Sequence, residues 1–214
     1  MKFPQPIQEG TQHTGKSPKV SWRCPVCLQF STLDRMPGVD DAVQGQLRVG
    51  IRRCSNPVCL EAIFVELVDH GVNVHACYPS QVITFDSTNL PEGVVKSLKE
   101  ALTCHAHQCF VAAAIMIRKT LEELCTHQNV TQGNLKTKIA QLANTITLPQ
   151  ELLAAMDELR LLGNDAAHIE SRTFTEIGKT EIEVAIEFTQ EILKAVYQYQ
   201  HLLERLRLLK APPK

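Results

Sequence analysis

The stretch QCFVAAAIMIRKTLEELCTH, residues Gln108–His127, decides the fold class of this chain. Its first half is rich in alanine and almost wholly apolar, and the whole stretch lacks proline and glycine, so it favours a helix. A helix that is apolar on all sides must be surrounded by other elements. We therefore predict a central helix in a bundle, with buried positions among Ala113, Ile115 and Ile117.

Helical periodicity continues on both sides of this segment. The candidate helices cover residues 91–106, 133–144, 149–163 and 180–209. Pro91 stands near the first turn of one of them, and Thr180 and Glu183 have the spacing of a capping box at the start of another. Short connections between successive helices favour antiparallel neighbours. These features predict an all-α bundle over residues 91–212.

The residues before the bundle have a different pattern. Residues 45–54 alternate between apolar and polar side chains, and residues 61–70 are rich in β-forming types, so both predict strands. Polar, proline-containing stretches predict a flexible leader at residues 1–20 and a linker at residues 76–90. The predicted fold class is therefore α+β, with a small β domain at residues 21–75 followed by the helical bundle.

Four cysteines in the β domain form two closely spaced pairs. Cys24 and Cys27 lie in CPVC, and Cys54 and Cys59 lie in CSNPVC. Two thiolate pairs on tight turns can close a tetrahedral Zn²⁺ site, and a β domain this small needs such a staple. Four thiolates leave no open position for water, so the zinc would be structural. The alternative is that they are separate core cysteines.

The other four cysteines are Cys77, Cys104, Cys109 and Cys125. The sequence CHAHQC, Cys104–Cys109, contains enough thiols and imidazoles for a second metal site. The expected turn near Gln108 makes a common helical face doubtful, and free cysteine is among the most buried residue types. We therefore favour free cysteines over a second metal site here.

Charge excludes a uniformly basic, nucleic-acid-coating protein, because 22 Lys and Arg stand against 23 Asp and Glu. A local patch remains open, since four arginines flank the cysteine pairs: Arg23, Arg48, Arg52 and Arg53. They could bind nucleic-acid phosphates, or they could form an ordinary solvated strand face.

The chain shows no membrane signal. The N-terminal sequence MKFPQPIQEG lacks an apolar signal region, and the longest apolar run, Cys109–Ile117, is too short to cross a bilayer. We expect a cytoplasmic protein that does not enter a membrane. The cytoplasm keeps thiols reduced, so disulfide bonds are not expected.

The stretch RLLGNDAAH contains a candidate catalytic stripe. On a continuous helix, Arg160, Asn164 and His168 would spread over about 80° and share a face. Histidine suits proton transfer, arginine can hold a phosphate, and asparagine can position an oxygen. The alternative is that Gly163 and Asn164 end the helix, so that the stripe is broken and His168 has only a packing or capping role.

Several of these motifs together resemble the domain of unknown function 4145 family. They are LPEGVVKSLKEA, AAAIMIRKTLEELC and ELRLLGNDAAH, followed by a final long helix. That family is grouped with the HEPN superfamily (higher eukaryotes and prokaryotes nucleotide-binding). The resemblance implies a HEPN-like helical bundle, homodimerisation, and a role in prokaryotic defence or stress.

Many HEPN proteins are metal-independent ribonucleases that pair an arginine with a histidine. The resemblance therefore implies that Arg160, Asn164 and His168 form the equivalent site and that Arg118 and Glu122 match the family's other polar element. Here seven residues separate Arg160 from His168, and a leucine follows the arginine, which departs from the nuclease pattern. The expected function is engagement of nucleic acid, most simply RNA, with endoribonuclease activity as an extension; the alternative is a non-catalytic interaction module.

Overall fold

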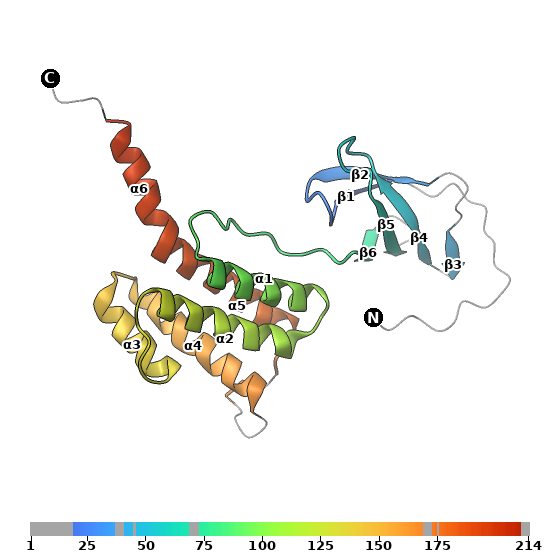
Figure 1. The fold of residues 1–214 in the computed structure, drawn as a ribbon. Helices are drawn as coiled ribbons and strands as arrows, with labels where there is room; N and C mark the ends of the chain where they lie inside the picture. Colours follow the sequence, from blue (N-terminus) through green and yellow to red (C-terminus); the bar gives the residue numbers. More distant parts are fainter. Residues whose placement is uncertain are drawn as a thin grey trace. The chain divides into compact units, whose positions relative to one another are not determined.

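A computed structural model describes residues 19–36, 41–44, 46–68, 73–168, 173–174 and 176–210. The chain divides into two compact units, Met1–Val82 and Ile83–Lys214. The described part of the first unit contains strands and that of the second contains helices (Figure 1). This is the α+β arrangement that the sequence predicts. Most of the predicted leader lies outside the described residues, which begin at residue 19.

The first unit is an antiparallel sheet. Its strands are β1 (Val20–Arg23), β2 (Phe30–Arg35), β3 (Ala42–Gln44), β4 (Leu47–Cys54), β5 (Ala62–Val68) and β6 (Asn73–Tyr78). The strand order is β1-β2-β4-β5-β6. Strand β3 is also paired with β4: it pairs with the first residues of β4, whereas β2 pairs with the last ones. The end strands β1 and β6 also approach each other, so the sheet curls around its inner face. Strand β6 extends the sheet into residues assigned above to the linker.

Alternation along the strands builds the core of the sheet unit. In β5, Ile63, Val65 and Leu67 are fully buried, as expected for side chains that point to one face every second residue. Trp22 of β1 packs against the same core. Because Trp22 is the only tryptophan of the chain, its fluorescence reports on this unit alone.

The same alternation places a charged residue inside the sheet. Gly50, Arg52 and Cys54 all point to the buried face of β4. Arg52 is completely buried and pairs in a two-pronged manner with Asp41, with Nη1–Oδ1 and Nη2–Oδ2 distances of 2.7 Å. A β-carbon on Gly50 would collide with the Asp41 carboxylate, so glycine is needed there for steric reasons. Arg52 is thus a core residue whose charge is matched by Asp41.

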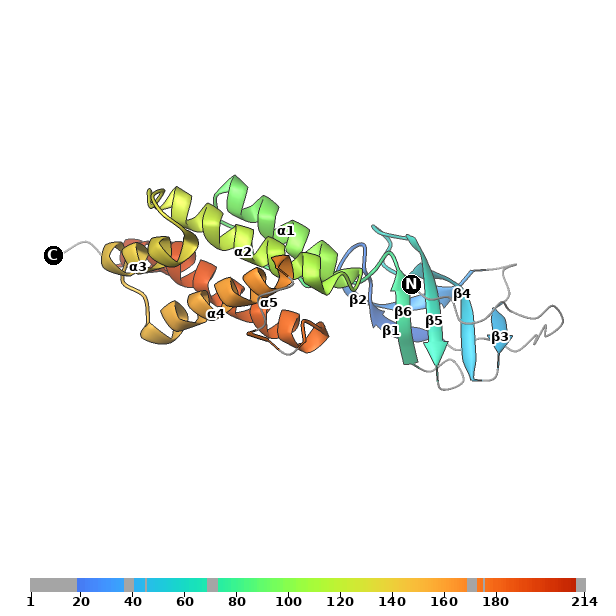
Figure 2. The same cartoon turned by 90° about the horizontal axis from the view of Figure 1, so that it is seen from below.

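The second unit is a helical bundle. Its helices are α1 (Glu92–Ala106), α2 (Phe110–His127), α3 (Leu135–Thr145), α4 (Gln150–Ala167), α5 (Lys179–Leu193) and α6 (Tyr199–Leu208). Helix α2 packs against α1, α3, α4 and α5, so it is central, and α1 and α2 lie side by side in both Figure 1 and Figure 2. Ala113 and Ile117 are buried, which confirms the prediction of buried positions in this helix, whereas Ile115 is 38% exposed.

Two predicted helix ends differ from the structure. Helix α4 does not stop at Gly163 but continues to Ala167, so the alternative in which Gly163 ends the helix is wrong. Helix α5 begins one residue before Thr180, with Gly178 as the N-cap and the Glu181 carboxylate accepting the Gly178 N–H at 3.0 Å. The predicted capping box of Thr180 and Glu183 is therefore wrong, because Glu181 already satisfies the N-terminal backbone.

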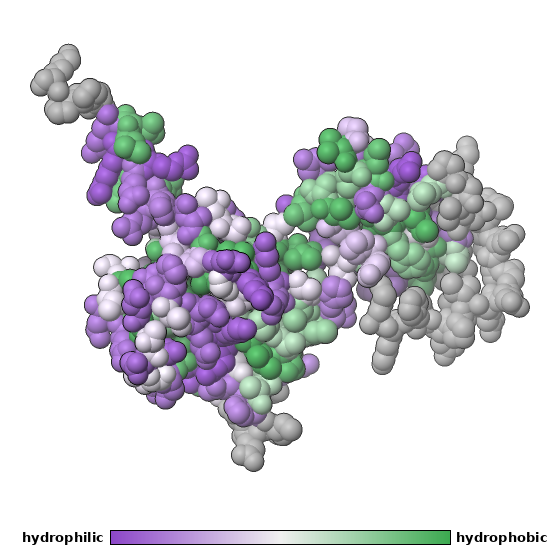
Figure 3. All heavy atoms as spheres, in the orientation of Figure 1, coloured by the Kyte–Doolittle hydropathy of each residue, from purple (hydrophilic) through white to green (hydrophobic). Residues whose placement is uncertain are grey.

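The last predicted helix is interrupted by one π-helical segment, Lys194–Gln198, which separates α5 from α6. Beyond it, α6 projects from the bundle (Figure 1) and every residue of it is exposed. Exposed apolar side chains stand among the polar ones on α6 in Figure 3, and they include Leu202, Leu206 and Leu208. Among the described residues, no helix is both long and apolar enough to cross a membrane.

Gly163 sets the closest approach of α4 to α2. A β-carbon at Gly163 would lie 2.5 Å from Cβ of Arg118, an atom that cannot move without the α2 backbone. We expect Gly163→Ala to destabilise the helical unit by about 1–3 kcal/mol, since overpacking outweighs the gain of up to about 1 kcal/mol in helix propensity. Urea unfolding followed by far-UV circular dichroism measures this effect.

Gly93→Ala is the matched control for this prediction. A β-carbon on Gly93 would lie 2.8 Å from Oε2 of Glu123, the far end of a flexible side chain. That carboxylate can move aside, so we expect no loss of stability in the control. Equal unfolding midpoints for the two variants would contradict the close α2–α4 packing.

Candidate metal centre and the polar residues of the bundle

The structure brings the four cysteines of the sheet unit together. The Sγ atoms of Cys24, Cys27, Cys54 and Cys59 all lie within 4.8 Å of one another, and the four cysteines are free thiols. Two Sγ–Sγ distances are 3.8 Å (Cys24–Cys59) and 3.9 Å (Cys27–Cys54). Such distances are far longer than a disulfide bond of about 2.05 Å. The arrangement could hold one metal ion.

The two cysteine turns are related copies of one local structure. Each contains the sequence Pro-Val-Cys-Leu, at residues 25–28 and 57–60. In each turn the leucine N–H donates back to the residue before the proline, Leu28 to Cys24 O at 2.9 Å and Leu60 to Asn56 O at 3.0 Å. Both leucines have left-handed backbones, with φ of 61° and 50°. The repeated sequence therefore builds the same tight turn twice.

Asn56 occupies in the second turn the place that Cys24 has in the first. The Val26 N–H donates to Cys24 Sγ at 3.4 Å, and the Val58 N–H donates to the Asn56 side-chain oxygen at 3.0 Å. The second turn is thus closed by an asparagine, and its first thiol, Cys54, comes from the end of β4. This explains the wider Cys54–Cys59 spacing. The repeat of Pro-Val-Cys-Leu was the sequence signal that could have identified Asn56.

Polar neighbours support the thiols. Ser31 Oγ lies 3.2 Å from Cys54 Sγ, and Asn56 Nδ2 donates to Cys27 Sγ at 3.6 Å. Backbone hydrogen bonding at Gln29 lowers the pKa of the Cys27 thiol to about 7, whereas burial raises the pKa of Cys24 to about 12. A metal ion bound to the cluster would convert the thiols to thiolates.

The four arginines near the cysteine pairs do not form one cationic face. Arg52 is buried and paired with Asp41, so its assignment to nucleic-acid binding is wrong. Arg48 is half-buried, and Arg23 donates from Nε to the Leu28 carbonyl at 2.7 Å, which fastens the first cysteine turn. Arg53 is exposed. Strand alternation explains this separation, because Arg52 shares the inner face with Cys54 whereas Arg53 points to the other face.

The Arg160, Asn164 and His168 positions lie near the C-terminal end of α4. Since the helix continues through Gly163, Arg160 and Asn164 share a helical face, whereas His168 is the exposed C-cap with an extended backbone. The Arg160 side chain is 11% exposed, and its Nε donates to Asp157 Oδ1 at 2.7 Å. This hydrogen bond lowers the pKa of the Asp157 carboxyl. Arg160 is thus partly engaged within its own helix.

The Asp165 side chain, next to Asn164, accepts hydrogen bonds from the backbone of Thr173 and Phe174. Its Oδ2 accepts the N–H of Phe174 at 2.7 Å and also the N–H of Thr173. The carboxylate therefore binds a backbone segment that follows the helix rather than capping a further helical turn.

Arg118 connects α2 with α4. Its Nη1 donates to the Arg160 carbonyl at 3.2 Å, its Nε lies 3.4 Å from Glu122 Oε1, and its stem lies against Gly163. Arg118 is therefore part of the helix–helix contact beside Arg160, and Glu122 pairs with it from the same helix. The structure brings these sequence-predicted polar residues to one region of the bundle.

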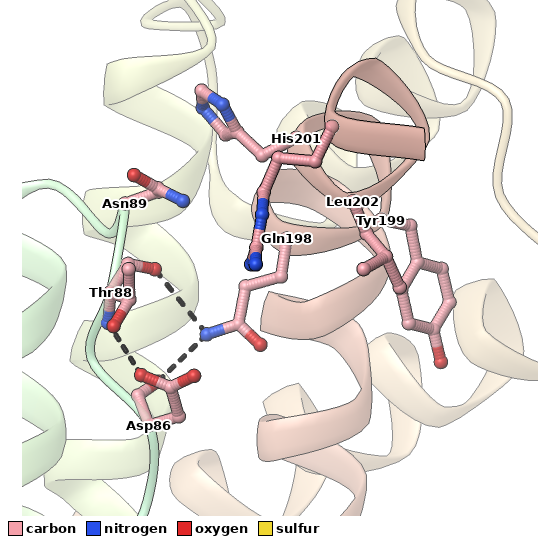
Figure 4. Close-up of a pocket in the computed structure, with 8 residues that line it drawn as sticks. Asp86, Thr88, Asn89, Gln198, Tyr199, His201 and Leu202 are labelled. Atoms are coloured by element: carbon pink, nitrogen blue, oxygen red, sulfur yellow. Dashed lines mark hydrogen bonds between the residues drawn. The ribbon is translucent and has the colours of Figure 1, made fainter. Parts of the chain in front are cut away.

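A small hollow lies where the π-helical segment meets the residues that precede α1 (Figure 4). Gln198 Nε2 donates to the carbonyls of Asp86 at 2.8 Å and Thr88 at 3.4 Å. These bonds attach the residues before α1 to the π-helical segment. His201 and Arg205 of α6 also line the hollow, and both are exposed. The hydrogen bonds of Gln198 thus cross one side of the hollow.

Comparison with known families gives one match. A family model described as Domain of unknown function (DUF4145) matches residues 99–209, just over half of the 214 residues. The matched range contains the Arg118–Glu122 pair, Arg160, Asn164 and His168. No curated protein and no solved structure matches the chain.

Proposed function

Because the chain belongs to the DUF4145 family, we propose that it is a zinc-stabilised protein of defence or stress in the cytoplasm, whose HEPN-like helical unit engages RNA as a homodimer. The observation that carries the zinc part is the cluster of four free thiols within 4.8 Å. Tetrahedral zinc with Zn–S bonds of about 2.3 Å separates its sulfurs by about 3.8 Å. The Sγ–Sγ distances of 3.8 and 3.9 Å match that geometry.

The zinc ion in this proposal is structural. All four positions of a tetrahedral ion would be taken by thiolates, so none would remain for a reacting water. The two Pro-Val-Cys-Leu turns and the end of β4 would be linked through one ion.

The RNA part of the proposal concerns the end of α4. His168 is exposed there, one helical turn beyond the half-buried Asn164. In the catalytic form of the proposal, His168 acts as general acid or base on the ribose 2′-OH, Arg160 holds the phosphate and Asn164 positions it. Such cleavage needs no metal. An RNA phosphate would have to displace Asp157 from Arg160.

A non-catalytic interaction module is the second candidate. The observation that favours it is the engagement of both arginines, with Arg160 bound to Asp157 and Arg118 bound to the α4 backbone. In this form, the polar residues fasten α2 to α4, and the surface of the unit serves only for binding.

Incubation of zinc-loaded protein with end-labelled RNA, without added divalent ions, separates these forms. Cleavage by the wild type that is lost in His168→Ala and retained in His201→Ala supports the nuclease; His201 is a matched exposed histidine on α6. RNA retention that weakens steeply with salt, without cleavage, supports RNA binding alone. If the protein neither cleaves RNA nor retains it at low salt, the result supports the interaction module.

The homodimer part of the proposal is supported by α6. Exposed leucines on a projecting helix, Leu202, Leu203 and Leu206 among them, are the kind of surface that a second copy can cover. We expect light scattering to give twice the 23.9 kDa mass of the chain. Leu202→Gln with Leu206→Gln should return the mass to one chain; a monomeric wild type would contradict this part of the proposal.

A further inference from the structure

The turn between α1 and α2 places two cysteines at the contact positions of a helix-ending motif. The Cys109 N–H donates to Cys104 O at 2.8 Å, and the Gln108 N–H donates to His105 O at 2.9 Å. Gln108 has a left-handed backbone with φ of 59°. These two bonds define a Schellman motif, in which the residues at the places of Cys104 and Cys109 commonly contact each other through their side chains.

The backbone bond limits the distance between the two cysteines. With standard bond lengths, an N···O distance of 2.8 Å keeps the two α-carbons within at most about 6.7 Å of each other. Disulfides form between cysteines whose α-carbons lie about 4.4–6.8 Å apart. A bond between Cys104 and Cys109 therefore falls within reach of the folded turn.

The end of α2 shows the ordinary use of the same motif. There the Val130 N–H donates to Cys125 O at 2.9 Å, and Asn129 has a left-handed backbone with φ of 62°. Cys125 and Val130 at these positions are buried, at 0% and 6% exposure. At the end of α1, by contrast, Cys109 is exposed and Cys104 is half-buried. The turn after α1 thus has two thiols at the positions where the turn after α2 has a buried contact. One of these thiols, Cys109, is exposed to solvent.

The neighbourhood of the two thiols gives them different roles. Burial raises the pKa of the Cys104 thiol, and the charge of Cys109 raises that pKa further. Cys109 has its sulfur 3.6 Å from the His107 carbonyl at the exposed edge of the turn. Cys109 is therefore the more accessible thiol to an oxidant in solution. Cys104 is the second thiol, with which an oxidised Cys109 would react.

We propose that Cys104 and Cys109 are a reversible redox site that peroxide converts to an intramolecular disulfide. The Cys109 thiolate attacks one peroxide oxygen, the O–O bond breaks, and the leaving hydroxide takes a proton to become water. The sulfur of Cys104 then attacks the resulting Cys109 sulfenic acid, so the S–O bond breaks and a second water leaves. Two thiols and one hydrogen peroxide become one disulfide and two waters, and a thiol reductant reverses the reaction by exchange.

The product would close a covalent loop across the α1–α2 turn. Helices α1 and α2 pack against each other, and His105 in this loop lies with Nε2 3.4 Å from Glu183 Oε1 in α5. The disulfide would therefore hold the end of α1 against α2 at the point where it also meets α5. This site does not depend on zinc or on RNA binding.

Peptide mapping of the full, zinc-loaded chain tests the proposal. Reduced protein is exposed to graded hydrogen peroxide, alkylated and digested with trypsin, which releases both cysteines in the single peptide Glu100–Arg118. We expect this peptide to lose two hydrogens and its uptake of alkyl groups at low peroxide, and to regain both alkyl groups after treatment with a thiol reductant.

Two variants sharpen the outcome. In Cys104→Ser, Cys109 should accumulate as sulfenic acid, and in Cys109→Ser the peptide should resist the same peroxide. A wild-type peptide that still takes up two alkyl groups, or one in which Cys109 is over-oxidised while Cys104 stays free, overturns the proposal. Cys125 is the internal reference, because that buried thiol should stay unmodified throughout.

Discussion

Removal of metal from the full chain is expected to unfold the sheet unit and leave the helical unit folded. Structural zinc supplies roughly 10–16 kcal/mol of apparent binding free energy in small zinc domains, which rivals or exceeds the roughly 5–15 kcal/mol stability of a typical domain. Trp22 packs against the core next to the thiol cluster, so its fluorescence should shift to that of a solvated indole. Far-UV circular dichroism, dominated by α1–α6, should keep most of its helical signal.

A single thiol substitution should act in the same way as the chelator. Cys54→Ser removes a buried thiol of the cluster at the end of β4, and we expect the purified variant to contain no stoichiometric zinc and to show the solvated Trp22 signal. Cys109→Ser is the matched control, since that cysteine lies in the helical unit, and it should retain one zinc ion per chain. If a chelator strips bound metal while Trp22 fluorescence stays native, or if the purified wild type contains no metal, the structural-zinc proposal is wrong.

Replacement of Asp41 by alanine is expected to cost the sheet unit about 3–5 kcal/mol, because the change leaves Arg52 charged and unpaired in the core. The two side chains are 0% and 3% exposed, so the unpaired guanidinium would lie away from bulk solvent. Urea unfolding of the zinc-saturated protein, followed by Trp22 fluorescence, should show the loss. Far-UV circular dichroism of the helical unit should not change.

An exposed ion pair in the same sheet provides the control. The Lys19 and Asp34 side chains are 76% and 41% exposed at a distance of 3.1 Å, so Asp34→Ala should change stability by no more than about 1 kcal/mol. Joint replacement of Arg52 and Asp41 by apolar residues should recover much of the loss, since no unpaired charge remains. An unfolding midpoint for Asp41→Ala equal to that of Asp34→Ala would contradict the buried pairing.

Local patterns predicted the parts of this protein that depend on nearby residues. The Cys-x-x-Cys turn needs only a few bonds of backbone to aim two sulfurs at one point, so the thiol cluster could be predicted from spacing. The helix at Gln108–His127 likewise followed from composition, and α2 is central as expected. Helix ends were less predictable, because Gly163 sits within α4 where its missing side chain lets Arg118 approach.

The candidate site in the bundle shows the opposite case. Spacing placed Arg160, Asn164 and His168 on one face; the continuous helix carries Arg160 and Asn164, whereas His168 follows its end with an extended backbone. It did not indicate that Asp157 would hold the Arg160 guanidinium or that Arg118 would reach across to the Arg160 carbonyl. Such pairings depend on rotamers and on the distance between α2 and α4, and neither is encoded in the period of a single helix.

The sequence by itself determined the two-part architecture, the four-cysteine cluster and the central helix, because periodicity and short spacings act through neighbouring residues. Only the tertiary structure decided which arginines are available. Arg52 and Arg53 are adjacent in the chain, yet the pleat of β4 sends one into the core against Asp41 and the other to solvent. Which face of a strand is buried is decided only when the sheet curls around its core.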